Sequence, residues 1–137
     1  MTALTKDILR EYELGDINEF LVEANTIIYA GAAVGLNEAG YARGLKVGDK
    51  FAGFADRHAN NTEGTDGETR IGVKRRGFIV LDIAGIGMDK VGSKVYASDD
   101  NSFTLSSSGD ASLIGNLVRY IDNVQGLVEF IAHKDNS

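Results

Sequence analysis

From Asn25 onward the sequence alternates short runs of β-branched and aromatic residues with glycine-rich turns. Runs spaced about 8 to 12 residues apart are typical of sandwiches and barrels of antiparallel strands. The chain has 17 glycines and no proline, so its turns must rely on Gly, Asn and Asp. We therefore predict a mainly β fold, a small β-sandwich or barrel-like domain of about ten short antiparallel strands.

Two features of these runs bear on the details of the fold. In the run at residues 50–55, Phe51 and Phe54 share one face of a sheet only if Gly53 lies near a β-bulge. Residues 47–51 resemble residues 91–95, which we interpret as a shared way of entering a strand from a glycine turn and not as a duplication.

The segment at residues 56–67 is polar and contains no apolar residue larger than Ala. Such a segment has nothing to contribute to a core, so we predict a long exposed loop, which is a common place for function.

The run at residues 78–83 is apolar on both faces, which predicts a strand covered on both sides by its own fold or by a partner. The preceding Lys74-Arg75-Arg76 is the chain's basic cluster. We interpret it as a solvated hairpin turn or as a contact to an acidic rim on a partner. A possible subunit interface therefore consists of Phe78, Val80, Arg75 and Arg76.

Residues 1–23 are rich in charged side chains and differ in this respect from residues 24–137. Apolar residues recur there every four positions, which indicates a short helix ending near Gly15. A helix this short needs a surface to pack on. We predict an N-terminal arm at residues 1–23, extended or helical, that orders on a neighbouring subunit, and a β domain at residues 24–137. Packing on its own domain and a frayed terminus are the alternatives. The arm residues expected to contact the neighbouring subunit are Leu4, Ile8, Leu9, Tyr12 and Leu14.

The chain offers little for catalysis, and we predict no enzyme activity, no catalytic residues, no cofactor and no metal site. It has no cysteine, which excludes disulfides and Cys-containing zinc sites. His58 and His133 are its two histidines, and neither stands at metal-ligand spacing. The carboxylate of Asp82 ends an apolar run, where hydrogen bonding to a neighbouring turn is the usual role.

The formal net charge of −6 argues against duplex DNA as a partner, because neutralising phosphates requires clustered Lys and Arg. No stretch is long and apolar enough to cross a bilayer, and the N-terminus lacks the layout of a secretion signal. We expect a protein made in the cytoplasm that binds neither nucleic acid nor membranes.

Several segments together resemble the head decoration, or capsid cement, proteins of tailed phages. They are residues 24–42, the run at 51–56 with the polar loop after it, residues 73–78, residues 91–96 with Asp99-Asp100, and the opening Leu4-Thr5-Lys6-Asp7. The arm departs from the family pattern, since residues 8–20 are more acidic and more apolar.

The resemblance implies a virion structural protein on the capsid exterior that binds the major capsid protein and stabilises the expanded phage head. It also implies a homotrimer at three-fold positions, with N-terminal arms reaching over adjacent shell subunits. Two alternatives stay open: another phage structural role in the tail or head–tail joint, and a glycan-binding module that stacks sugars on Tyr29, Tyr41, Tyr96 and Tyr120.

Overall fold

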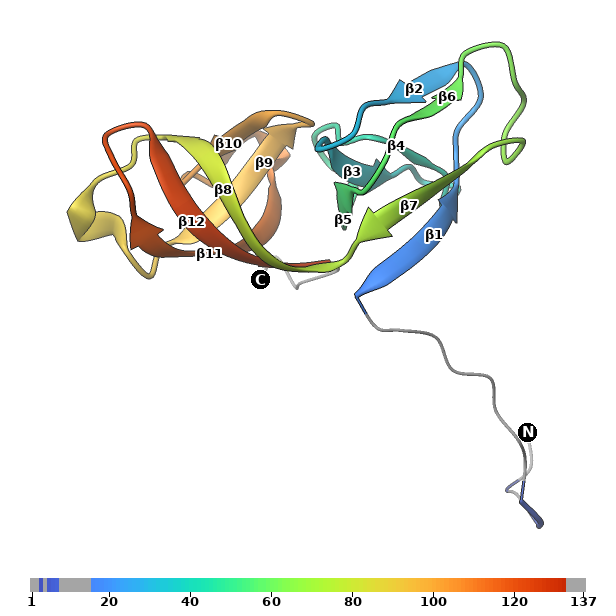
Figure 1. Ribbon diagram of the computed structural model, residues 1–137, viewed down its shortest axis with the longest axis horizontal. Coiled ribbons are helices and arrows are strands. Elements are labelled where there is room, and N and C mark those ends of the chain that lie inside the picture. The colour runs from blue at the N-terminus through green and yellow to red at the C-terminus, as the bar shows by residue number, and fades with distance from the viewer. Residues whose placement is uncertain (1–2, 4, 8–15, 133–137) are drawn as a thin grey trace.

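The computed structural model describes residues 3, 5–7 and 16–132 of the chain (Figure 1). Within these residues almost all regular structure is β, so the predicted mainly β, barrel-like fold is confirmed. The strands are β1 (Ile17–Leu21), β2 (Thr26–Ile28), β3 (Ala33–Leu36), β4 (Ala42–Gly44), β5 (Lys50–Ala55), β6 (Ala59–Asn61), β7 (Arg70–Lys74), β8 (Arg76–Ala84), β9 (Lys94–Asp99), β10 (Ser102–Thr104), β11 (Ser112–Tyr120) and β12 (Gln125–Ile131). Two short 3₁₀ helices, η1 (Met88–Lys90) and η2 (Ser108–Asp110), lie in connections.

The strands form two barrels, which lie side by side in Figure 1. The second barrel is closed, in the order β10-β8-β12-β11-β9. The first barrel is the sheet β1-β7-β5-β3-β4, whose two ends are brought together by an isolated parallel bridge between Val22 and Ala42. A separate ribbon, β2 with β6, covers the first barrel at the top of the view.

The two barrels have the same topology. In chain order and without the ribbon, the five strands are β1, β3, β4, β5 and β7 in the first barrel and β8, β9, β10, β11 and β12 in the second. In both barrels the first of these five strands pairs antiparallel with the fifth, and the fifth pairs antiparallel with the fourth. The fourth then pairs with the second and the second with the third, both antiparallel. The third strand returns parallel to the first. One strand arrangement is therefore used twice in succession.

A β-bulge in the fourth strand also occurs in both barrels. The register shifts next to Gly53 in β5 and next to Gly115 in β11. A Cβ on Gly53 would overlap the carbonyl oxygen of Lys74, and one on Gly115 would overlap that of Glu129, so each glycine lets the fifth strand approach closely. The sequence required a bulge near Gly53 if Phe51 and Phe54 were to share one face, and the structure has this bulge, with both rings in one core.

The similar segments at residues 47–51 and 91–95 are not a trace of this repeat. The first leads into β5, a fourth strand, whereas the second leads into β9, a second strand. Both Gly48 and Gly92 have positive φ, which fits the interpretation as a shared turn into a strand.

The two barrels share a hydrophobic core and form one domain. The bulge turns Phe51 and Phe54 to the outer side of the first barrel, where they enter the core of the second. The Phe54 ring lies 4.9 Å from that of Phe130 and 6.0 Å from that of Phe103, and the Phe51 ring lies 6.3 Å from that of Phe130. The first barrel keeps its own core of small and branched residues between Val22 and Val73.

The polar segment at residues 56–67 is not the long exposed loop that its composition predicted. It contains β6, which pairs with β2, and both Ala59 and Asn61 are buried. The Asn61 Nδ2 donates hydrogen bonds to the carbonyl oxygens of Val22, Glu23 and Thr65 at 3.3, 2.9 and 3.0 Å. A buried amide with its hydrogen bonds satisfied takes the place that an apolar side chain usually holds.

Two predicted boundaries also differ from the structure. β7 and β8 do not form a hairpin, because β7 belongs to the first barrel and β8 to the second, with Arg75 as the residue between them. β1 pairs with β7 along its length and Val22 is fully buried, so residues 17–23 of the predicted arm belong to the β domain.

A charge network around the buried carboxylate of Asp49 fixes β4 against the turn before β5. Arg43 donates from Nε and Nη2 to the two carboxylate oxygens of Asp49, at 3.0 and 2.8 Å, and its Nη1 lies 3.3 Å from a Glu23 oxygen. The Asp49 side chain is 4% exposed. The hydrogen bond to Asp49 raises the pKa of Arg43, with smaller contributions from the charges of Asp49 and Glu23.

The turn between β11 and β12 gives a pH-dependent prediction. Asp122 Oδ1 accepts hydrogen bonds from the backbone N–H of Gln125 and Val124, at 2.8 and 2.9 Å, which lower the pKa of Asp122 below its ordinary value of 3.8. The turn is therefore stabilised above the ordinary pKa and loses that contribution as the pH falls through the lowered one. We expect an NMR titration of the Asp122 carboxyl carbon to give a midpoint below 3.8, and a midpoint above it contradicts the assignment.

Candidate interaction surface

The outer face of the second barrel exposes the apolar side chains that the sequence singled out. On β8 the side chains of Leu81 and Ile83 point into the core, whereas Phe78 is 64% and Val80 47% exposed. The second face of this strand is thus not covered by its own fold within the part of the chain that the structure describes, which leaves a partner as the predicted cover.

Strand β12 completes this face. Its antiparallel register places Glu129 opposite Phe78, Leu127 opposite Val80, and Ile131 opposite Arg76. Directly opposed side chains on one face of a sheet lie about 5 Å apart at Cβ, so each pair forms a local contact.

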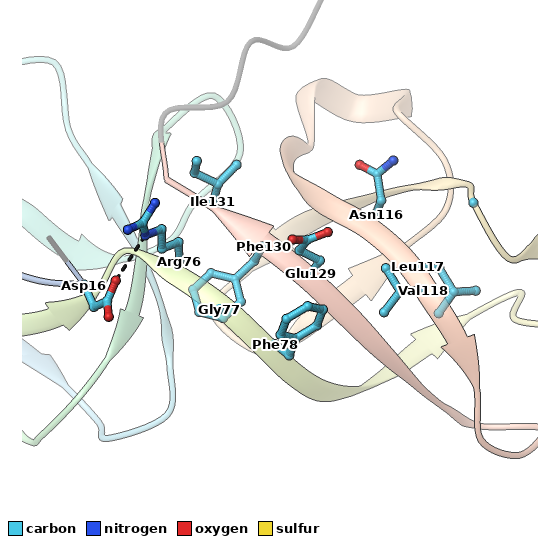
Figure 2. Close-up of a pocket in the computed structure, with 11 residues that line it drawn as sticks. Asp16, Arg76, Gly77, Phe78, Asn116, Leu117, Val118, Glu129, Phe130 and Ile131 are labelled. Atoms are coloured by element: carbon cyan, nitrogen blue, oxygen red, sulfur yellow. Dashed lines mark hydrogen bonds and ion pairs between the residues drawn. The ribbon is translucent and has the colours of Figure 1, made fainter.

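A groove of about 710 Å³ runs over this face, and we call it the outer groove (Figure 2). Phe78 stands at its side, and Glu129 lies on its floor between Phe78 and Asn116. The residues that line the outer groove are Asp16, Arg76, Gly77, Phe78, Gly92, Asn116, Leu117, Val118, Glu129, Phe130 and Ile131.

The N-terminal segment joins the domain at the edge of the outer groove. The carboxylate of Asp16 lies 3.0 Å from Arg76 Nε, and the Asp16 carbonyl oxygen accepts a hydrogen bond of 2.8 Å from the backbone N–H of Arg75. On the other side of Phe78, a second hollow of about 390 Å³ is bounded by Ile17 and Lys74 of the first barrel. The structure therefore brings the start of the domain beside the predicted interface.

The predicted site residues have different outcomes. Phe78 and Arg76 line the outer groove, Val80 extends the same face along β8, and Arg75 occupies the junction between the barrels. The predicted arm contacts lie outside the described residues; they are Leu4, Ile8, Leu9, Tyr12 and Leu14.

Sequence reasoning missed the floor of the outer groove. Glu129, Ile131 and Asn116 join Phe78 only because β12, the partner of β11, also pairs with β8, which is distant from both in the chain. The alternation in the last strand indicated that Glu129 and Ile131 share a face, but nothing in that pattern names the strand opposite.

Other candidate sites are less well formed. In the described part of the chain no three His, Cys, Asp or Glu side chains are grouped to hold a metal ion. The tyrosines do not form a common platform for sugars, because Tyr96 is 9% exposed and packs with Ala111 and Leu113. Tyr29 is exposed and lies edge-on to His58, with their ring centroids 5.7 Å apart.

Comparisons with known proteins give no neighbour from which to transfer a function. No family model, curated protein or solved structure matches the chain. No helix within the described residues has the length and apolar character needed to cross a membrane.

Proposed function

We propose that this protein is a virion structural protein that decorates the outside of a tailed-phage head. It binds the major capsid protein and stabilises the expanded shell. It acts by binding and not as an enzyme, and it is made in the host cytoplasm before it joins the particle. The sequence resemblance suggests this role, and the geometry of the described residues supports it.

The observation that carries the proposal is the outer groove beside the point where the N-terminal segment joins the domain. Phe78 and Val80 give this face exposed apolar area, which is characteristic of a surface that another protein covers. Asp16 anchors the segment at the same place. The outer groove and the N-terminal tether lie at the same edge of the domain, so they can bind two neighbouring shell subunits at once. Two weak contacts that are linked in this way bind more tightly together than either contact does alone.

A homotrimer, which the sequence resemblance implies, is the alternative use of this face, with a second copy of the chain covering Phe78 and Val80 in place of a shell subunit. Closed symmetry is the usual outcome for identical subunits that expose one apolar surface. Arg75 and Arg76 lie at the edge of this face, where they border any neighbouring copy.

A truncation tests the tether. Removing residues 1–15 keeps β1 and its pairing with β7, so the truncated protein should fold with an unchanged melting temperature. We expect it to bind purified undecorated heads at least about tenfold more weakly than the full chain, because one of two linked contacts is lost. Copies per head are counted by sedimentation and quantitative gel analysis. Undiminished decoration by the truncated protein rules out the tether.

Labelled full-length protein tests the proposed location. Gold-labelled protein should cover the head in electron micrographs of reconstituted particles. If label is found only on the tail or at the head–tail joint, the protein has the alternative structural role and does not decorate heads. If no particle carries label, both structural roles are excluded.

A further inference from the structure

We propose that the outer groove recognises an arginine side chain on an extended segment of its protein partner, with the guanidinium stacked on Phe78 and paired with Glu129. This inference rests on the proposed function only in taking the partner to be a shell subunit, and it names what the groove binds there. It is drawn from three observations on the described residues.

The first observation is the chemistry of the groove. The exposed aromatic ring of Phe78 stands directly opposite the exposed carboxylate of Glu129. A planar cation fits this pair, because it can lie on the ring face and pair with the carboxylate at its edge. Arginine suits the pair better than lysine, because its guanidinium is planar and less strongly hydrated.

The second observation is the charge balance. The outer groove is lined by two carboxylates, those of Asp16 and Glu129, and by one cation, Arg76. Arg76 is already paired with Asp16 at 3.0 Å, whereas no ion pair involves Glu129 within the described residues. With no cation of the described residues paired to it, the carboxylate of Glu129 attracts a cation from another molecule.

The third observation is that a guanidinium lies on the outer face of the first barrel, one residue pair along the strands from the pair that corresponds to Phe78 and Glu129. The pairs Ile17–Lys74 and Phe78–Glu129 hold the same place in the repeated topology, as do Glu19–Gly72 and Val80–Leu127. In the first barrel the connection after β5 supplies Arg57, whose guanidinium would lie 3.5 Å from a Cβ on Gly72.

The Arg57 Nη2 atom is 3.5 Å from the carboxylate of Glu19, so a guanidinium from the chain itself crosses that face. In the second barrel the corresponding connection, residues 121–124, is a short turn that contains no arginine. This connection therefore places no arginine of its own over the outer face of the second barrel.

The test uses the full-length protein and four peptides. Each is an acetylated, amidated nonapeptide of alternating Val and Thr with Arg, citrulline, Lys or Glu at its centre. Citrulline keeps the planar shape of arginine without the charge. We expect the Arg peptide to shift the backbone amide NMR signals of Phe78, Glu129 and Ile131, the Lys peptide to bind more weakly, and the citrulline peptide to bind at least about fivefold more weakly.

Variants of the protein locate the effect. Glu129→Gln and Phe78→Leu change exposed side chains, so both should stay folded and weaken binding of the Arg peptide by about fivefold or more. Val124→Ala removes an exposed apolar side chain from the turn between β11 and β12 and serves as the matched control, with unchanged binding.

The outcomes separate this inference from the proposed function. Equal binding of the Arg and citrulline peptides, shifts elsewhere on the protein, or no binding at all overturns the arginine site. If the protein binds the Arg peptide at the outer groove but does not decorate heads, the arginine site is supported and the proposed decoration function is contradicted. If the Glu129→Gln variant decorates heads as well as the unchanged protein does, the decoration function is supported and the arginine site is contradicted.

Discussion

Replacing Gly53 by alanine is expected to destabilise the protein by about 4 kcal/mol. Two costs combine at this position. The φ of Gly53 is +122°, which side chains other than glycine rarely adopt, and the added Cβ would overlap the carbonyl oxygen of Lys74. Backbone atoms of the neighbouring strand cannot move aside without breaking the β5–β7 ladder.

Thermal and urea unfolding of Gly53→Ala measure this loss, and for a chain of this length the melting temperature should fall by about 15 °C. Gly31→Ala is the matched control, because Gly31 also has a positive φ, +88°, but has no atom within 4 Å of the added Cβ. It should cost about 1 kcal/mol, from the backbone conformation alone. Equal losses in the two variants contradict the close approach of β5 and β7.

Replacing Arg43 by alanine is expected to cost about 3 kcal/mol, because it leaves the carboxylate of Asp49 buried without its cation. Asp49 then keeps the backbone N–H of Lys46, at 3.1 Å, as its remaining hydrogen-bond donor. The pKa of Arg43 is raised in the folded protein, so its guanidinium stays charged at both neutral and mildly alkaline pH. The effect should therefore be the same at pH 7 and pH 9.

The control is Arg70→Ala, which removes an exposed pair with Glu19 at 3.9 Å and should change the free energy of unfolding by less than about 0.5 kcal/mol. A second substitution identifies the cause. If the cost comes from the unpaired charge, adding Asp49→Asn to Arg43→Ala should restore about 1 kcal/mol. Further destabilisation by the second substitution places the cost in packing instead.

Local patterns were enough to predict several parts of the fold. The run at residues 50–55 coincides with β5, and the three-residue spacing of Phe51 and Phe54 predicted the bulge at Gly53. The apolar pattern at residues 78–83 predicted a strand covered on both sides by its own fold or by a partner, and the structure shows that within the described residues the fold leaves Phe78 and Val80 exposed. In each case the structure is determined by residues close together in the sequence, through the alternation of apolar side chains along a strand and the backbone conformations open to glycine.

The features that the sequence did not reveal depend on contacts between distant residues. Asn61 is buried with its amide bonded to the distant carbonyl oxygens of Val22 and Glu23 as well as to that of nearby Thr65, whereas the composition of its segment predicted exposure. The repeat of the two barrels is visible only in strand pairing, since their residues show no matching pattern. Glu129 could be placed on a face but not opposite Phe78, because register between remote strands has no local signal.

The first barrel has a core of its own, whereas the core of the second barrel also contains residues of the first, and this difference bears on how the chain folds during synthesis. Every residue of the first barrel's core lies between positions 22 and 73, so this half can pack while the ribosome is still making the rest. The second barrel has no such independence, because its interior includes Phe51 and Phe54 from the earlier half. Phe51 and Phe54 therefore stay uncovered during synthesis until the later strands close on them, and the first barrel is complete only when the second has formed.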